Sequence, residues 1–189
     1  GSAISVASGA TFAVNQSDTV TQGTDFSNAP ISGAGSFTQA GSGTTVLNEA
    51  NTYSGGTNIN AGVLQVEDAG ALGTAGTIDF GGGTLKYTAT NTEDYSARIA
   101  NSTSAISVDT NGQDVTYATA LAASNTGGLT KTGEGTLELT GSNLYTGNTS
   151  IDNGTFLANN ASGSATGGST AISVTGDAVL GGSGTVGTT

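Results

Sequence analysis

The chain has 189 residues, with 32 glycines, one proline, no cysteine and no histidine. Fourteen acidic and three basic residues give a formal net charge of -11, which argues against nucleic acid and anionic membranes as partners because both need clustered Lys and Arg. Without Cys and His there are no disulfides, no Ser–His or Cys–His triads, and none of the usual ligands of transition metals.

Short β-branched runs that alternate with polar residues or end at glycine predict strands along the whole chain. The predicted strands are 3–6, 10–14, 35–39, 44–47, 57–60, 63–66, 77–80, 84–87, 105–108, 115–118, 129–132, 136–139, 149–151, 155–157, 171–174 and 178–180. The best helix signal, at 91–94 ahead of Arg98, is too short to predict more than a turn.

Comparable strands begin about 19 to 22 residues apart, at Thr44, Val63 and Thr84 and again at Thr136 and Thr155. That spacing is about one coil of a parallel β-helix, in which each strand pairs with the coils before and after it. The sequence therefore predicts an all-β solenoid of about eight or nine coils, forming a single domain over 1–189.

An internal repeat supports the solenoid. Residues 41–66 and 133–158 align without a gap, 92 residues apart, and are identical at ten of 26 positions. A looser match extends the two copies to 35–66 and 127–158, and 77–87 corresponds to 171–181 if two or three residues of slippage are allowed. Asn-Gly signals at 111–112 and 153–154 are typical of hairpins, but a hairpin sandwich has no reason to repeat the same turn residues so far along the chain.

The residues shared by the two copies are predicted to have structural roles. They are Gly41, Gly43, Thr44, Leu47, Asn51, Tyr53, Gly55, Thr57, Ile59 and Gly62 in the first copy, and Gly133, Gly135, Thr136, Leu139, Asn143, Tyr145, Gly147, Thr149, Ile151 and Gly154 in the second.

Three kinds of role are expected for these residues. The pairs Leu47/Leu139, Ile59/Ile151 and Leu64/Phe156 are expected in the core. The pair Asn51/Asn143 is expected at corners, where the side-chain amides bond neighbouring backbone. Tyr53 and Tyr145 either pack over a corner or form an exposed contact, and the central prediction is that both tyrosines have like surroundings.

Residues 128–141, GLTKTGEGTLELTG, continue through Asn143, Tyr145 and Gly147 in a pattern that resembles the autotransporter-associated β-strand repeat, also called the passenger-associated transport repeat. The first copy departs from this pattern, with Gln39 where Lys is usual and with Thr45 and Val46 where Leu and a polar residue are expected. The stretch from Asp94 to Asn111 resembles the family's usual spacer.

The resemblance implies a right-handed parallel β-helix within the passenger of a type V secreted bacterial protein. Such repeats lie in an extracellular stalk at the cell surface and assist passage across the outer membrane. The implied partners are the rest of a larger passenger and its outer-membrane translocator barrel. In this interpretation Gly1-Ser2 is a cloning remnant, and the chain is cut from a longer array.

A glycan-active β-helix enzyme is the main alternative. Lyase chemistry would need clustered cations, whereas Lys86, Arg98 and Lys131 are spread over 45 residues. A glycosidase would need two opposed carboxyl groups, but the adjacent pairs Glu67-Asp68 and Glu93-Asp94 fall at predicted turns. The chain is therefore predicted not to be an enzyme.

No cofactor or metal site is predicted either. Calcium-loop patterns are absent, which leaves only weak calcium binding at Glu67-Asp68 as an open alternative. The glycines at 81–83 and 181–184 lack the Lys and the following helix of a phosphate loop and are expected to form tight corners. Thr-rich outward faces, such as Thr84 and Thr136/Thr155, leave self-association and contact with surface glycan or matrix as possible binding roles.

Overall fold

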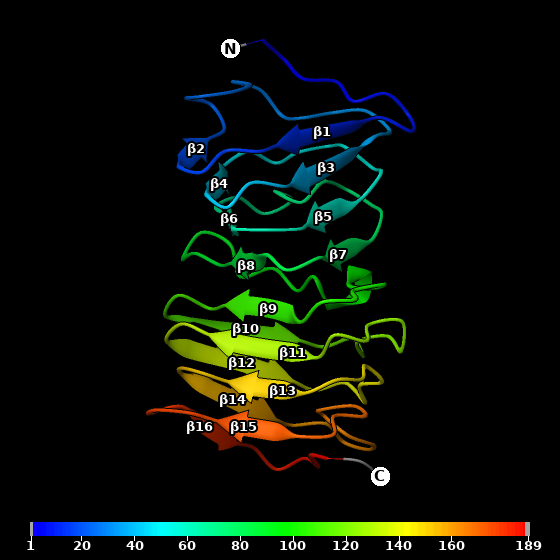
Figure 1. The fold of residues 1–189 in the computed structure, drawn as a ribbon, viewed down its shortest axis with the longest axis vertical. Coiled ribbons are helices and arrows are strands. Elements are labelled where there is room, and N and C mark those ends of the chain that lie inside the picture. Colours follow the sequence, from blue (N-terminus) through cyan, green and yellow to red (C-terminus); the bar gives the residue numbers. More distant parts are fainter. Residues whose placement is uncertain (1, 188–189) are drawn as a thin grey trace. The chain divides into compact units, whose positions relative to one another are not determined.

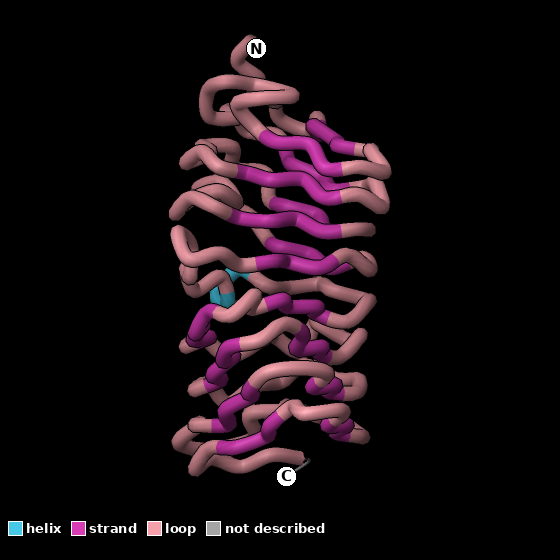
Figure 2. The backbone as a smooth tube through the Cα atoms, turned by 90° about the vertical axis from the view of Figure 1, so that its left-hand side faces the viewer, coloured by secondary structure: helices cyan, strands magenta, loops and turns pink. Residues whose placement is uncertain are grey.

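The computed structural model describes residues 2–187, an all-β protein built from short parallel strands. The chain divides into two compact units, Gly1–Glu93 and Asp94–Thr189, called unit 1 and unit 2 below. Each unit contains two parallel sheets whose strands alternate along the chain. Figure 2 shows these strands as short segments joined by loops.

Unit 1 has eight strands in two sheets (Figure 1). The first sheet has the order β1 (Thr11–Val14), β3 (Ser36–Gln39), β5 (Thr57–Ile59) and β7 (Ile78–Phe80). In the second sheet β2 (Thr19–Thr21), β4 (Thr44–Leu47), β6 (Val63–Val66) and β8 (Thr84–Lys86) follow one another.

Unit 2 repeats this arrangement. The strands β9 (Ile106–Asp109), β11 (Leu129–Thr132), β13 (Thr149–Ile151) and β15 (Ile172–Val174) follow one another in one sheet. The other sheet has the order β10 (Gln113–Tyr117), β12 (Gly135–Leu139), β14 (Thr155–Ala158) and β16 (Val179–Gly181). A three-residue 3-10 helix, Ser96–Arg98, lies ahead of them.

The strand register confirms a parallel β-solenoid of about eight turns. In unit 1 Phe37 pairs with Thr57, which pairs with Ile78. In unit 2 Leu129 pairs with Thr149, which pairs with Ile172. Each pairing joins residues one coil apart, so residues near one another in the core come from successive coils.

Side-chain alternation divides each strand into an inward and an outward set. In β4 Thr45 and Leu47 have no exposed surface, whereas on the other side Thr44 is half-buried and Val46 is 7% exposed. Their neighbours in β6, Leu64 and Val66, are also buried. Removing a Leu or Phe side chain from water in this way stabilises the fold by roughly 1.5–3 kcal/mol per residue, and the stacked inward residues form the core of each unit.

Fifteen of the sixteen predicted strands correspond to strands of the structure. The prediction at 3–6 is wrong, because this segment makes only the isolated bridge between Ser5 and Ser32. The strand β2 was not predicted, since its sequence, Thr-Val-Thr, is too short to show an alternating pattern.

The slippage between the two copies is located by the register. Thr57 pairs with Ile78, and its counterpart Thr149 pairs with Ile172. The equivalent residues Ile78 and Ile172 are therefore 94 positions apart, whereas Thr57 and Thr149 are 92 apart. Val63 pairs with Thr84 and its counterpart Thr155 pairs with Val179, so the equivalent residues Thr84 and Val179 are 95 positions apart. The extra residues lie in loops and leave the pairing of the strands intact.

Two further expectations concern the limits of the domain. The structure divides the chain into the two units described above. The expectation of a single domain over residues 1–189 stays a prediction. The proposed cloning remnant includes Gly1, which lies outside the described residues.

Candidate functional site

The side chains of Asn51 and Asn143 connect three successive coils in each unit. Asn51 Oδ1 accepts hydrogen bonds from the Ile31 N–H (2.7 Å) and from Gln22 Nε2 (2.8 Å), and Asn51 Nδ2 donates to the Ala71 carbonyl (2.8 Å). The partner residues Ile31 and Ala71 lie 20 positions before and after Asn51. One buried amide thus satisfies backbone groups on both neighbouring coils.

Asn143 makes the matching contacts in unit 2. Its Oδ1 accepts from the Leu121 N–H (2.6 Å) and its Nδ2 donates to the Ala165 carbonyl (2.8 Å). Both partners lie 22 residues away, and Asn143 is only 3% exposed. The loops are longer than in unit 1, yet the amide reaches one coil back and one coil forward in the same way.

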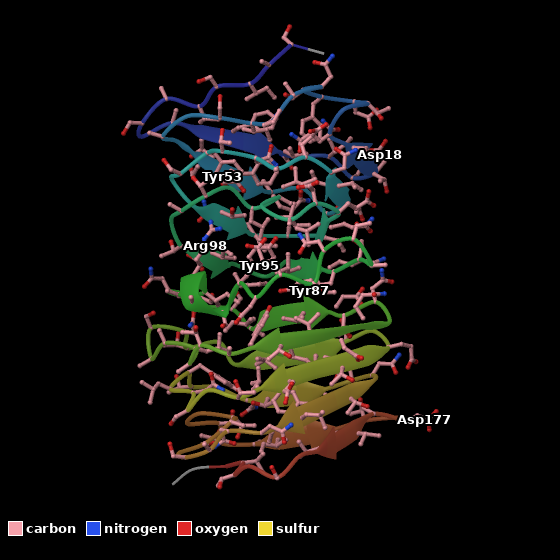
Figure 3. The ribbon with its side chains drawn as sticks, turned by 180° about the vertical axis from the view of Figure 1, so that it is seen from behind. Asp18, Tyr53, Tyr87, Tyr95, Arg98 and Asp177 are labelled. Carbon is pink, nitrogen blue, oxygen red and sulfur yellow. The ribbon has the colours of Figure 1, made fainter. Side chains whose placement is uncertain are left out.

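The repeated tyrosines are buried and hydrogen-bonded alike. Tyr53 Oη lies 2.7 Å from Thr57 Oγ1, and Tyr145 Oη lies 2.7 Å from Thr149 Oγ1. Both rings have no exposed surface, which rules out the alternative of an exposed contact. Figure 3 labels Tyr53 among the coils of unit 1, in contrast to the solvent-exposed Asp18.

The two tyrosines have different second neighbours. Tyr53 stacks on Phe37, with ring centroids 6.1 Å apart. In unit 2 Thr149 also shares a 2.7 Å hydrogen bond with Ser169. Burial raises the pKa of Tyr145 to about 12, although its hydrogen bonds to neighbouring hydroxyls act in the opposite direction. The phenol therefore stays protonated and acts as part of the core.

Residues 39 and 131 are polar side chains in inward positions of their strands. Gln39 Nε2 donates to the Gly41 carbonyl at 2.8 Å, and its Oε1 accepts a short hydrogen bond from Thr45. Lys131 Nζ donates to the carbonyls of Gly133 (2.6 Å) and Thr132 (2.9 Å), and to that of Asn153 (3.1 Å). Each side chain satisfies the carbonyls of the glycine corner that follows its own strand.

The Lys131 side chain has no exposed surface. Burial lowers its pKa to about 8, and the negative charges of Asp109 and Glu134 oppose this shift. A buried amine of lowered pKa is typical of some catalytic lysines, but Nζ here is surrounded by backbone carbonyls of its own corner. Its contacts are those of a structural donor.

The corners that follow β5 and β13 are too tight for any side chain at their glycine. Gly62 and Gly154 have φ values of 57° and 65°. An added Cβ would lie 2.2 Å from the Gly43 carbonyl oxygen at the first and 2.5 Å from the Gly135 carbonyl oxygen at the second. These glycines therefore allow successive coils to approach closely at the corner.

The carboxylates considered for glycosidase chemistry bind backbone and side-chain N–H groups. Glu67 accepts from Gln65 Nε2 (2.7 Å), and Glu93 accepts from the Gly70 N–H (2.9 Å). Asp94 accepts from the Ser96 N–H (2.8 Å) and from the Ala118 N–H (2.9 Å). Glu93 and Asp94 thus hold turns and neighbouring coils in place.

Other candidate sites are weak as well. Within residues 2–187 no three Asp, Glu, His or Cys side chains gather as a metal site would require. The glycines at 81–83 form the corner between β7 and β8, and a strand follows them instead of a helix. A pocket of about 280 Å³ beside the exposed Leu144 is lined by Ser142, Asn143, Ser164 and three glycines, without a charged group. Over the same described part of the chain, no helix has the length and apolar character needed to cross a membrane.

The sequence did not reveal the structural roles of two buried side chains, Gln22 and Lys131. Gln22 pairs its amide with that of Asn51 through two hydrogen bonds, of 2.8 and 3.2 Å. Lys131 was considered only as a catalytic cation. The available signal was its position, because a polar residue in the inward register of an alternating strand must find buried partners.

Comparison with known proteins finds the same two repeats. The passenger-associated transport repeat profile matches residues 37–66 and 129–158, the segments that carry the paired Asn, Tyr and Gly residues. The chain carries two copies of the passenger-associated transport repeat. In both copies the Asn of the repeat joins its coil to the coils before and after it.

A curated relative extends the likeness beyond the repeats themselves. The chain is 38% identical over 162 residues to the adhesin BmaC autotransporter of Brucella suis biovar 1 (strain 1330). This alignment covers 83% of the chain but 5% of the relative. No solved structure matches the chain. The chain is thus similar to a segment of an autotransporter, and the passenger domains of such proteins are exported to the cell surface.

Proposed function

We propose that this segment is a non-enzymatic stalk that supports adhesive regions of a larger passenger and favours its export. The observation that carries the proposal is the matched use of Asn51 and Asn143, each of which bonds the coils before and after it. Polar groups that a binding or catalytic site would direct to solvent are here used in stacking. The relative's description as an adhesin supports an adhesive parent protein.

Stacked coils also suit export. Each coil contacts only its neighbours, so a solenoid gains stability as successive coils are added. A chain that emerges from a translocator would then fold coil by coil. The partners in this proposal are the rest of the passenger and the outer-membrane translocator that anchors it.

The test compares two variants of the parent protein on its own cells. The double variant Asn51→Ala/Asn143→Ala removes the bonds between coils, and we expect less passenger at the surface and faster proteolysis of what arrives. In the control, residues 37–66 are replaced by 129–158, which has the same length and the same repeat residues, so export should be retained.

Adhesion is then measured per molecule at the surface. A stalk predicts that adhesion per displayed molecule stays the same in both variants. Loss of adhesion at a normal surface amount would instead indicate a specific glycan- or matrix-binding module, and saturable binding of the isolated chain to a glycan array would support the same conclusion.

The enzyme alternative has a separate test. The chain should release no reducing ends from mixtures of polysaccharides. Turnover that disappears in Glu67→Gln, Asp68→Asn, Glu93→Gln or Asp94→Asn would overturn the non-enzymatic assignment.

A further inference from the structure

The corner between β13 and β14 contains a sequence with reactive chemistry. Asn153 is exposed and is followed by Gly154, at φ 65°. The Gly154 N–H donates to Asn153's own Oδ1 at 2.8 Å. This contact holds the backbone nitrogen of Gly154 beside the side-chain amide carbon of Asn153, with no side chain on Gly154 to hinder their approach.

We propose that Asn153 is a site of spontaneous deamidation in the folded protein, with water as the only co-reactant. The deprotonated Gly154 nitrogen attacks Cγ of Asn153, a C–N bond forms, and the side-chain amide leaves as ammonia. Water then opens the resulting succinimide at one of its two carbonyls, which gives aspartate or isoaspartate. The sum of these steps consumes one water and releases one ammonia, with no change of oxidation state.

The second Asn-Gly pair in the chain provides an internal contrast. Asn111 is also exposed and also precedes a glycine. The Gly112 N–H, however, donates to the Glu134 carbonyl of the next coil at 2.7 Å. This hydrogen bond occupies the Gly112 N–H and must open before the nitrogen is able to attack. The fold therefore distinguishes two pairs that are identical in sequence.

The matching corner of unit 1 provides a second contrast. Ala61-Gly62 lies 92 residues before Asn153-Gly154 and has the same close approach at its glycine. Alanine at position 61 shows that the corner forms without an Asn side chain. The substitution Asn153→Ala should therefore keep the fold, and Ala61→Asn should transfer the reaction to unit 1.

The product changes the surroundings of Lys131. Its Nζ donates to the Asn153 backbone carbonyl at 3.1 Å. In isoaspartate the chain continues through the former side-chain carbon, so this carbonyl becomes a free carboxylate. A neutral acceptor of the buried ammonium is then replaced by a negative charge, and the backbone of the corner gains one methylene group.

The experiment follows both asparagines in the intact 189-residue chain. The folded chain and the urea-unfolded chain are kept in mildly alkaline buffer, and peptides are mapped by mass spectrometry with enzymatic methylation of isoaspartate. Unfolded chain should react at similar rates at both sites. In folded chain we expect Asn111 to react about tenfold more slowly than Asn153, the ratio expected if one hydrogen bond must open first.

The variants complete the test. Asn153→Ala should abolish the product at 153 without changing the rate at 111, and Ala61→Asn should add product at 61. Asn153 that stays intact in folded chain while it reacts in unfolded chain would overturn the proposal. Equal rates at 111 and 153 in folded chain would overturn it as well.

Discussion

Positions 39 and 131 are equivalent in the two units but hold different side chains. Gln39 in unit 1 and Lys131 in unit 2 each donate to the first glycine carbonyl of the following corner, at 2.8 and 2.6 Å. Gln39 also accepts from Thr45, whereas Lys131 reaches further, to the carbonyl of Asn153. The corner thus requires a buried donor at this position but does not require a charge.

The comparison separates what the repeat conserves from what it varies between its copies. Contacts between coils are the same in both units at Asn51/Asn143 and Gly62/Gly154, and Tyr53 and Tyr145 share a hydrogen bond to a threonine four positions later in the chain. The side chains that donate to carbonyls of the corner after their own strand differ between the copies, as Gln39 and Lys131 do. If this distinction holds, substitutions at matched coil-joining positions should have similar costs in both units where the partners also match, and substitutions at locally acting positions should not.

The largest effect is expected from the core. Leu47→Ala and Leu139→Ala each remove a side chain without exposed surface, and each should lower the free energy of unfolding by about 2–5 kcal/mol. Urea unfolding followed by circular dichroism measures the cost, and hydrogen exchange locates it in one unit. Leu144→Ala is the control because Leu144 is 59% exposed. A cost at Leu139 no larger than at Leu144 would break the equivalence.

The corner amides should have effects of comparable size. Asn143→Ala leaves the Leu121 N–H and the Ala165 carbonyl without their partner, and each buried group left unpaired costs about 1–3 kcal/mol. Asn51→Ala should cost more, because Gln22 Nε2 loses its acceptor too. Hydrogen exchange should show faster opening of the coils on both sides. Protection lost on one side alone would contradict the bridging role, and the exposed Asn148→Ala variant is the matched control.

Removal of a buried hydroxyl should have a smaller effect. Tyr53→Phe and Tyr145→Phe keep the ring and lose one hydrogen bond to a threonine, at a cost of about 1 kcal/mol each. A double-mutant cycle with Thr149→Val isolates the pair in unit 2. Additive costs in that cycle would mean that the 2.7 Å contact contributes nothing of its own to stability.

The smallest effect at neutral pH is expected for Lys131→Gln, since Gln is the residue at the matching position of unit 1. Its signature is pH dependence. The folded pKa of Lys131, about 8, lies below its ordinary value of 10.5. Between these values the unfolded chain holds a proton that the folded chain has released, so the stability due to this group rises with pH from about 8 to about 10.5.

The measurement is the difference in unfolding free energy between the wild type and Lys131→Gln across this window. The difference removes contributions shared by both chains, such as the tyrosines. We expect the wild type to gain stability relative to the variant as pH rises. A flat difference would show that the carbonyl contacts of Nζ hold the ammonium form as firmly in the folded chain as water does in the unfolded chain.

The fold class and the two transport repeats were predictable from the residues alone. Strand spacing of about one coil and two gapless copies of the same turn residues are sufficient for a stack of parallel coils, because stacking is the arrangement that places like residues in like surroundings. The alternation of side chains also identified Leu47, Ile59, Leu139 and Ile151 as inward residues, and all four are buried.

The groups that bond from coil to coil could be identified only in the folded molecule. Asn51 finds Ile31 and Ala71 20 residues away on either side, and no local pattern identifies such partners. It also decided that the Gly112 N–H is held by Glu134 while the Gly154 N–H faces its own neighbour. The physical reason is that these hydrogen bonds depend on the distance between successive coils, which packing sets and which the spacing of residues along the chain does not.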